Sequence, residues 1–252
     1  MHTKQDLSPQ LAALNINPAG TLMVHLSCKA IGEIEGRGNT VLDTLTEYMR
    51  PGLLVLPSHT WANVNTNPPV NNPVMDVLHT PTCVGILAEL FRKRPGVCRS
   101  LHPTHSLAAI GKEAEEFLSG EERIQTPCGK GGAYYKLWER NAQILLIGVN
   151  FTRNTFIHGI EEWDGAQGTI SQEKTDLYVI NYEGQRIYAP QYRHCARLGS
   201  ETFSKLEPEA IRKGILTLGR FGDATARLMR AAPLREMTAA LLKNDANYLN
   251  RY

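Results

Sequence analysis

Two short apolar runs with a helical pattern between them constrain the fold of this chain more than any other feature. The runs are "GTLMVHLS" at residues 20–27 and "GLLVLPS" at residues 52–58. The segment between them, residues 39–49, places four apolar side chains on one helical face: Val41, Leu42, Leu45 and Tyr48. A strand, a helix and a second strand in this order form a βαβ unit, so the sequence predicts an α/β fold.

The rest of the chain carries further signals of the same kinds. The patterns predict strands at residues 106–111 and 143–149, a β-hairpin at 175–190, helices at 80–94 and 112–120, and helical segments from about residue 207 to the end. Thr80 would cap the first of these helices. Irregular loops are expected at residues 59–79 and 126–137. No segment has the composition of a linker, so we expect one domain over residues 1–252.

The overall composition disfavours several classes of protein. With 27 Lys and Arg against 25 Asp and Glu, the net charge of +2 is too small and too dispersed for a nucleic-acid-binding surface. No apolar run approaches the roughly 20 residues that span a bilayer, and the start "MHTKQDLSPQ" lacks the apolar core of a secretion signal. We therefore expect a cytoplasmic protein without membrane or nucleic-acid partners, whose five scattered cysteines are reduced thiols.

The stretch "RSLHPTHS", residues 99–106, carries two histidines three positions apart, His102 and His105. Metal ligation, proton transfer and turn formation are the three roles open to them. Pro103 prevents a helix through the pair, and the HExxH pattern of helical zinc ligands is missing, which disfavours metal ligation. In the structural alternative an imidazole caps a backbone turn, and we expect this of one of the two.

A second candidate site is "NTFIHGIEEW", residues 154–163, which follows the strand predicted at residues 143–149. It therefore lies beyond the carboxyl end of a central strand, where α/β sheets bind ligands. His158 and Glu161 are three residues apart and share a face if the segment is helical. The plain alternative is a surface helix with a pair of glutamates.

The loop after the first strand combines several glycines with basic residues. Its backbone N–H groups could bind a phosphate, helped by Lys29, Arg37 and the start of the helix at Thr40. The glycine spacing, which includes Gly32, matches neither GxGxxG nor the P-loop pattern, and a glycine turn without a ligand is the more frequent case. Cys128 in "TPCGKGG" has no activating neighbour in the sequence, which favours an inert buried thiol.

Taken in order, these segments resemble the aminoglycoside 3-N-acetyltransferase family, whose fold differs from that of the GNAT acetyltransferases. The matching pieces run from about residue 20 to residue 230, and the longest is "TPTCVGILAELFRKRPGVCRSLHPTHSLAAIGKEA". Others are "VHLSCKAIGEIEG", "GLLVLPS", "TPCGKGGAYYKL" and "ILLIGVNFTRNTFIHGIEE". The resemblance implies a single-domain α/β/α sandwich with a mixed central sheet. It also implies transfer of an acetyl group from acetyl-CoA to an amine without a metal.

The resemblance also implies roles for particular residues. His105 would be the general base, oriented by Glu161 and with His102 beside it. The contacts to acetyl-CoA would come from the loop after the first strand and from the histidine stretch: Ser27, Lys29, Gly32, Arg37, Thr40, Ser100, Thr104 and Ser106. The amine would lie near Asp76, His158, Glu161 and Glu162. We expect direct transfer without an acyl-enzyme, and a homodimer is compatible with this interpretation.

Two features leave the substrate and the activity open. The "LSCK" loop departs from the serines that the family commonly has there, and residues 59–79 offer Asp76 as their only carboxylate to a polycationic aminoglycoside. The expected acceptor is therefore the 3-amino group of an aminoglycoside or another small amine. The alternatives are a metal-dependent hydrolase built on His102, His105 and His158, and a non-catalytic relative that binds CoA.

Overall fold

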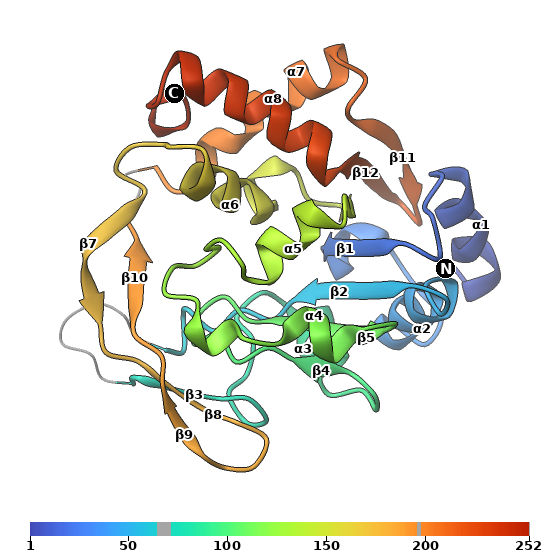
Figure 1. The fold of residues 1–252 in the computed structure, drawn as a ribbon. Helices are drawn as coiled ribbons and strands as arrows, with labels where there is room; N and C mark the ends of the chain where they lie inside the picture. Colours follow the sequence, from blue (N-terminus) through green and yellow to red (C-terminus); the bar gives the residue numbers. More distant parts are fainter. Residues whose placement is uncertain (65–71, 196–197, 252) are drawn as a thin grey trace.

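Seven strands build the central sheet of the structure, a computed structural model that describes residues 1–64, 72–195 and 198–251. They are β1 (Thr21–Leu26), β2 (Leu53–Pro57), β4 (Cys98–Arg99), β5 (Leu107–Gly111), β6 (Gln143–Ile147), β11 (Thr217–Phe221) and β12 (Ala224–Arg230). Their order is β11-β12-β6-β1-β2-β5-β4 (Figure 1). The central strand β1 pairs in parallel with β2 and β6, and the outer pairs are antiparallel. The prediction of a mixed sheet is confirmed.

Helices cover both faces of this sheet. On one face lie α1 (Lys4–Ala13), α2 (Gly38–Tyr48) and α3 (Ile86–Arg92). On the other lie α4 (Ala114–Leu118), α5 (Ala133–Glu139), α6 (Phe156–Trp163), α7 (Leu206–Arg212) and α8 (Ala231–Asn244). Alternate residues of β1 enter the two cores, with Met23 in one and Leu22 and Val24 in the other. The predicted α/β/α sandwich is thus confirmed, and none of the helices in the described ranges is long and apolar enough to cross a bilayer.

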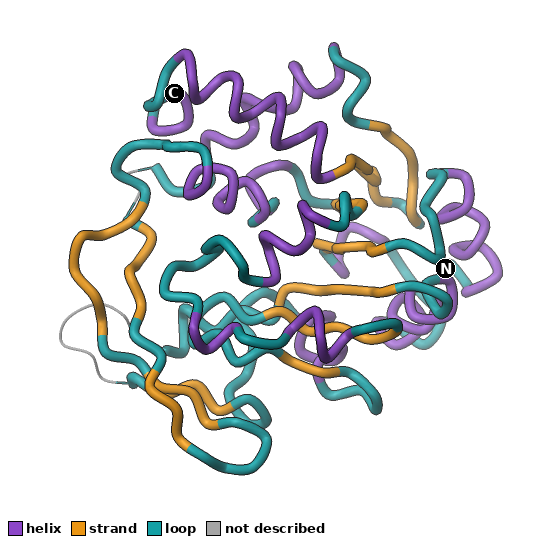
Figure 2. The backbone as a smooth tube through the Cα atoms, viewed as in Figure 1, coloured by secondary structure: helices purple, strands orange, loops and turns teal. Residues whose placement is uncertain are grey.

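Two small sheets extend from the end of the central sheet to which β1 and β2 point (Figures 1 and 2). One contains β3 (Val74–Asp76), β8 (Tyr178–Ile180) and β9 (Arg186–Tyr188), and the other pairs β7 (Ile170–Thr175) with β10 (Gln191–His194). Because β8 and β9 form an antiparallel pair, the hairpin predicted at residues 175–190 is confirmed. Short 3-10 helices join the elements: η1 (Cys28–Ile31), η2 (Glu121–Arg123), η3 (Phe151–Arg153), η4 (Glu201–Lys205) and η5 (Tyr248–Asn250).

The C-terminal part differs from its predicted helical pattern. Residues 217–230 form the hairpin of β11 and β12, which extends the sheet beyond β6. Phe221 is the only residue of β11 that is buried, so this edge strand has no apolar alternation by which to detect it. Two helices also lie where none was predicted, α1 in the polar leader and α5 within the loop expected at residues 126–137.

The helix predicted from Thr80 onward begins later, at Ile86, because the residues before it make other contacts. The Thr80 hydroxyl accepts a hydrogen bond from the amide of Asp76 (2.8 Å) instead of capping a helix. The hydroxyl of Thr82 donates to the carbonyl oxygen of His59 (2.9 Å). These bonds fasten the segment before α3 to the loops around it, where a regular helix would not reach.

Candidate active site

A cavity of about 890 Å³ lies at the carboxyl ends of β1 and β2. Ser27 follows β1, His59 follows β2 and His105 precedes β5, and all three line it. The antiparallel pairing of β2 with β5 continues past both strands, since the amide of Thr60 donates to the carbonyl oxygen of Thr104 (2.8 Å). His59 and His105 are therefore cross-strand neighbours in the wall of the cavity.

Four histidines from four segments lie in a row along this cavity. Ring centroids are 4.8 Å apart for His59 and His105, 5.4 Å for His105 and His194, and 4.3 Å for His194 and His158. At one end of this histidine row, the Tyr134 hydroxyl lies 2.7 Å from Nε2 of His59. Burial, together with the neighbouring imidazoles, holds the pKa of His59, His105 and His194 well below the ordinary value. These three rings are uncharged at neutral pH.

His158, at the other end of the row, is held by a buried carboxylate on its own helix. Its Nδ1 lies 2.8 Å from Oε2 of Glu161, and the Glu161 side chain is 1% exposed. This hydrogen bond places the proton on Nδ1, so Nε2 carries a lone pair, and no hydrogen bond to Nε2 is found within the described ranges. A carboxylate in this position also stabilises the imidazolium that forms when Nε2 takes up a proton. His158 thus has the geometry of a general base.

His102, in contrast, is fully buried and uses both ring nitrogens in bonds to the backbone. Its Nδ1 accepts from the amides of His105 (2.9 Å) and Thr104 (3.2 Å), and its Nε2 donates to the carbonyl oxygen of Thr126 (3.1 Å). Burial lowers its pKa to about 4. His102 therefore caps the turn, which is the role predicted for one histidine of this pair.

The structure does not support the pairing of Glu161 with His105. Glu161 is bonded to His158, and Nδ1 of His105 lies instead 3.0 Å from the hydroxyl of Thr104. Without a carboxylate to stabilise its charged form, and with its low pKa, His105 is a weak proton acceptor at neutral pH. The geometry favours His158 over His105 as the base.

A second buried carboxylate, Glu162, contacts another member of the histidine row. Its Oε1 lies 3.1 Å from Nε2 of His194 and accepts the amide of Cys128 at 2.9 Å. Burial raises the pKa of Glu162 to about 7, while that of His194 is lowered, so the two form a hydrogen bond rather than a full ion pair. Burial also raises the pKa of the Cys128 thiol well above its usual value, as expected of an inert cysteine.

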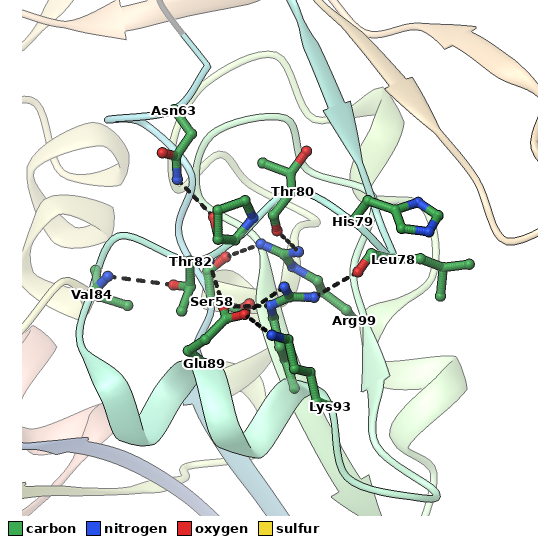
Figure 3. A network of polar contacts seen from close by, with 12 residues as sticks. Ser58, Asn63, Leu78, His79, Thr80, Thr82, Val84, Glu89, Lys93 and Arg99 are labelled. Atoms are coloured by element: carbon green, nitrogen blue, oxygen red, sulfur yellow. Dashed lines mark hydrogen bonds and ion pairs between the residues drawn. The ribbon is translucent and has the colours of Figure 1, made fainter.

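A buried cation fixes the backbone on both sides of the pair formed by His59 and His105. Arg99 is 3% exposed and donates to the carbonyl oxygen of Ser58 (2.8 Å; Figure 3). It also donates to Oγ of Ser106 (3.2 Å). Ser58 precedes His59, and Ser106 follows His105. Burial lowers the pKa of Arg99 to about 10, which leaves the guanidinium charged at neutral pH. Arg99 therefore holds two strand ends together next to the histidine row.

Only part of the set predicted to contact acetyl-CoA lines the main cavity: Ser27, Lys29 and Thr104. The others lie elsewhere: Gly32, Arg37, Thr40, Ser100 and Ser106. Both serines are buried and structural, because Oγ of Ser100 accepts the amide of Leu107 (3.0 Å) and Oγ of Ser106 donates to the carbonyl oxygen of Ser58 (2.5 Å). Arg37 is exposed on the surface, and Gly32, with φ +89°, packs against Asp223.

The residues predicted to hold the amine are also divided. His158 lines the main cavity, while Glu161 and Glu162 line a smaller hollow of about 450 Å³. Asp76 lines neither. Its carboxylate accepts the amides of Leu78 and His79 at 2.8 and 2.9 Å, and so closes the turn after β3.

The sequence assigned no role to His59, Tyr134 or His194. His59 did have a signal, since it directly follows the strand predicted at residues 52–58, at the edge where α/β sheets present functional side chains. Tyr134 and His194 had none. They reach the row only through the packing of α5 and the pairing of β10 with β7.

The metal-hydrolase alternative finds no ligand set in the ranges that the structure describes. No three His, Cys, Asp or Glu side chains converge there as a metal site requires. His102, one of its three expected ligands, has both ring nitrogens bonded to backbone groups. His102 could ligate a metal only if the backbone turn that it caps adopted another conformation.

Comparisons of the sequence with known proteins point to one family. A sequence model of the family described as aminoglycoside 3-N-acetyltransferase matches residues 23–243. The chain is 28% identical to the SPbeta prophage-derived aminoglycoside N(3')-acetyltransferase-like protein YokD of Bacillus subtilis, over 90% of this chain and 87% of that protein. It is 29% identical to aminoglycoside N(3)-acetyltransferase IV of a Salmonella species, over 95% of this chain and 85% of that protein.

A solved structure is similar in fold. The binary complex of AAC-IIIb with CoASH matches 96% of this chain and 97% of its own, with a TM-score of 0.84 and 22% identity. The fold and the sequence match agree over nearly the whole chain. The chain therefore belongs to the aminoglycoside 3-N-acetyltransferase family.

Proposed function

We propose that this chain transfers an acetyl group from acetyl-CoA to a primary amine of an aminoglycoside or a related small amine. The observation that carries the proposal is the hydrogen bond of His158 to Glu161 (2.8 Å) in the wall of the main cavity. Membership of the family and the CoASH complex of AAC-IIIb support the choice of donor and of reaction.

The chemistry requires a base because an ammonium ion has no lone pair with which to attack a thioester. Nε2 of His158 takes one proton from the ammonium, and Glu161 stabilises the positive ring. The amine nitrogen then bonds to the acetyl carbon, and the C–S bond breaks with its electron pair on sulfur. A second proton of the nitrogen passes to the sulfur, which leaves as the thiol, and His158 returns its proton to solvent.

The main cavity fits the acetyl donor. Its volume of about 890 Å³ is within the usual range of ligand cavities. The hydroxyls of Ser27 and Thr104 and the ammonium of Lys29 line it, and these are donors that amide and phosphate groups bind. Lys29 would hold a phosphate, and the hydroxyls would hold the amide-containing arm.

Transfer in this proposal is direct. An acyl-enzyme would need a nucleophile beside the base, and Cys128 is 2% exposed with a strongly raised pKa. Its amide and thiol both contact neighbouring groups, Glu162 and the carbonyl oxygen of Thr155. The thiol therefore has neither the charge nor the access that attack on a thioester requires.

His158→Ala tests the base directly. Removal of Nε2 should lower kcat by at least about 100-fold, in the usual range for a general base, with acetyl-CoA binding unchanged. Release of the CoA thiol measures turnover, and calorimetry measures donor binding. His105→Ala is the matched control, because it removes another ring of the same row, and it should cost less than about tenfold. Retained turnover in His158→Ala with loss in His105→Ala would overturn the assignment.

A further inference from the structure

We infer that the acceptor is a small amine with a single positive charge and an aromatic or aliphatic body, and not a polycationic aminoglycoside. This inference rests on the proposed acetyl transfer and narrows its acceptor. It follows from the charges in the cavity walls and from exposed apolar side chains at its rim.

The walls of the main cavity carry no carboxylate in the part of the chain that the structure describes. Neither Asp nor Glu lines it, whereas Lys29, Arg153 and Arg193 do. Residues 65–71 and 196–197 lie outside the described residues, and their sequence contains neither Asp nor Glu. The several ammonium groups of a polycation would therefore find no carboxylate partner in these walls, which disfavours its binding.

The nearest carboxylates do not change this balance. Glu161 and Glu162 line the smaller hollow, but their side chains are only 1% and 5% exposed. Glu161 is bonded to His158, and Glu162, whose pKa burial raises to about 7, is only partly ionised at neutral pH. Asp164, the next acidic residue of the chain, is paired with Arg235 at 2.8 Å. These three carboxylates do not form a surface that could hold several ammonium groups.

Apolar side chains form part of the rim of the main cavity. Trp61 is 51% exposed and Ile86 59%, and Val84 lines the cavity with them. We call Trp61, Val84 and Ile86 the apolar rim. Large apolar side chains left exposed beside a cavity favour a ligand that buries them under its own apolar surface.

The segment that leads to Val84 is held by polar contacts of Thr82, which Figure 3 shows beside Val84 and Glu89. Just before Val84, the amide of Thr82 donates to Oε2 of Glu89 (2.9 Å), a residue of α3. The hydroxyl of Thr82 donates to the carbonyl oxygen of His59 (2.9 Å), which belongs to the histidine row. The Val84 end of the rim therefore has a defined position relative to the row, as a specificity wall requires.

A panel of acceptors at saturating acetyl-CoA tests the inference through release of the CoA thiol. The probes are 2-phenylethylamine, glucosamine and kanamycin, of which only kanamycin carries several positive charges. We expect kcat/KM to be highest for 2-phenylethylamine and at least about tenfold lower for kanamycin. A higher value for kanamycin or for glucosamine would overturn the inference and leave acetyl transfer standing. Absence of thiol release with all three would overturn the proposed function and the inference together.

Substitutions at Ile86 separate acceptor binding from donor binding. Ile86→Ala should raise KM for 2-phenylethylamine about fivefold, while KM for acetyl-CoA stays unchanged. Ile86→Glu should lower KM for kanamycin, because it adds the missing negative charge. Leu218→Ala is the matched control, since Leu218 is 53% exposed on β11 and does not line the cavity. A rise in KM for acetyl-CoA alone in Ile86→Ala would show that the rim holds the donor, and would overturn the inference.

Discussion

The turn at residues 99–106 and helix α6 each hold a histidine, His102 and His158, and the two rings have opposite chemistry. His102 uses both nitrogens for backbone groups, whereas His158 gives one nitrogen to Glu161 and presents no protein bond at the other within the described ranges. The backbone holds the first ring in one tautomer, whereas the second ring offers Nε2 to a substrate. The bonding partners of an imidazole, and not the sequence motif around it, therefore decide which role it has.

The largest effect that we expect is a loss of folding stability in acid, caused by buried histidines that stay uncharged in the folded protein. The pKa of His25 and of His102 is about 4 in the folded protein, against an ordinary value of 6.5. Above pH 6.5 both states hold these rings neutral. As the pH falls towards 4, only the unfolded chain takes up the protons, so each ring should cost about 3 kcal/mol of stability. Urea unfolding at pH 7.5 and pH 5 measures this, and an undiminished free energy of unfolding at pH 5 would contradict it.

Two buried glutamates should change the folding stability in the opposite direction as the pH falls, and they supply a control for the acid experiment. Burial raises the pKa of Glu121 and of Glu162 to about 7, from an ordinary 4.5. Their stabilising contribution is complete below pH 4.5 and is lost as the pH rises through 7. The double variant Glu121→Gln with Glu162→Gln lacks this contribution, so it should lose more stability on acidification than the native chain. An equal loss in both proteins would show that these carboxyls titrate normally.

His102→Ala should have the next largest effect, on stability. The substitution leaves the amides of Thr104 and His105 and the carbonyl oxygen of Thr126 without their partner, and it opens a cavity. We expect a loss of about 2–4 kcal/mol in the free energy of unfolding. His102→Asn keeps an acceptor for the two amides and should lose only about 1 kcal/mol. Similar losses in the two variants would argue against the capping role.

Glu161→Gln, in helix α6, should have a smaller effect, and this effect should be on kcat. Glutamine keeps an oxygen that can accept from Nδ1 of His158, but it no longer stabilises the positive ring. We expect kcat to fall about tenfold to 100-fold, which corresponds to about 1.4–2.7 kcal/mol, with acetyl-CoA affinity unchanged. Glu162→Gln is the neighbouring control and should change kcat less than about threefold. Thiol-release kinetics measure both, and equal kcat values in the two variants would contradict the assigned pairing.

Local patterns predicted the parts of the fold and the site that depend on local geometry. The buried strands around β1 and the helical spacing of His158 and Glu161 need only a few neighbouring residues to be recognised, and the structure has both. The edge strand β11 was not predicted because four of its five residues are not buried, so it has no apolar alternation. The start of α3 was predicted too early because Thr80 and Thr82 form hydrogen bonds with Asp76 and His59, which lie outside the helix.

The histidine row required contacts that no sequence pattern records. His59 and His105 meet through the pairing of β2 with β5, and His194 arrives from β10. The selection of His105 as base from its motif lacked this information. The spacing of His158 and Glu161 allowed their pairing, but only the structure shows that Glu161 is bonded to His158 and that Nδ1 of His105 lies beside the hydroxyl of Thr104 instead.

The backbone pairing of Thr60 with Thr104 has a consequence for how acceptor selection can evolve. The chain leaves the histidine row at Thr60 and returns at Thr104, and these two points are hydrogen-bonded neighbours. Trp61 and Ile86 lie on the excursion between them. This excursion includes α3 and β4, but lengthening a flexible connection between its elements costs little, about 0.6 kcal/mol for each doubling of the connection's length. Descendants of this chain can therefore remodel the excursion and acquire new acceptors while they inherit the proton chemistry intact.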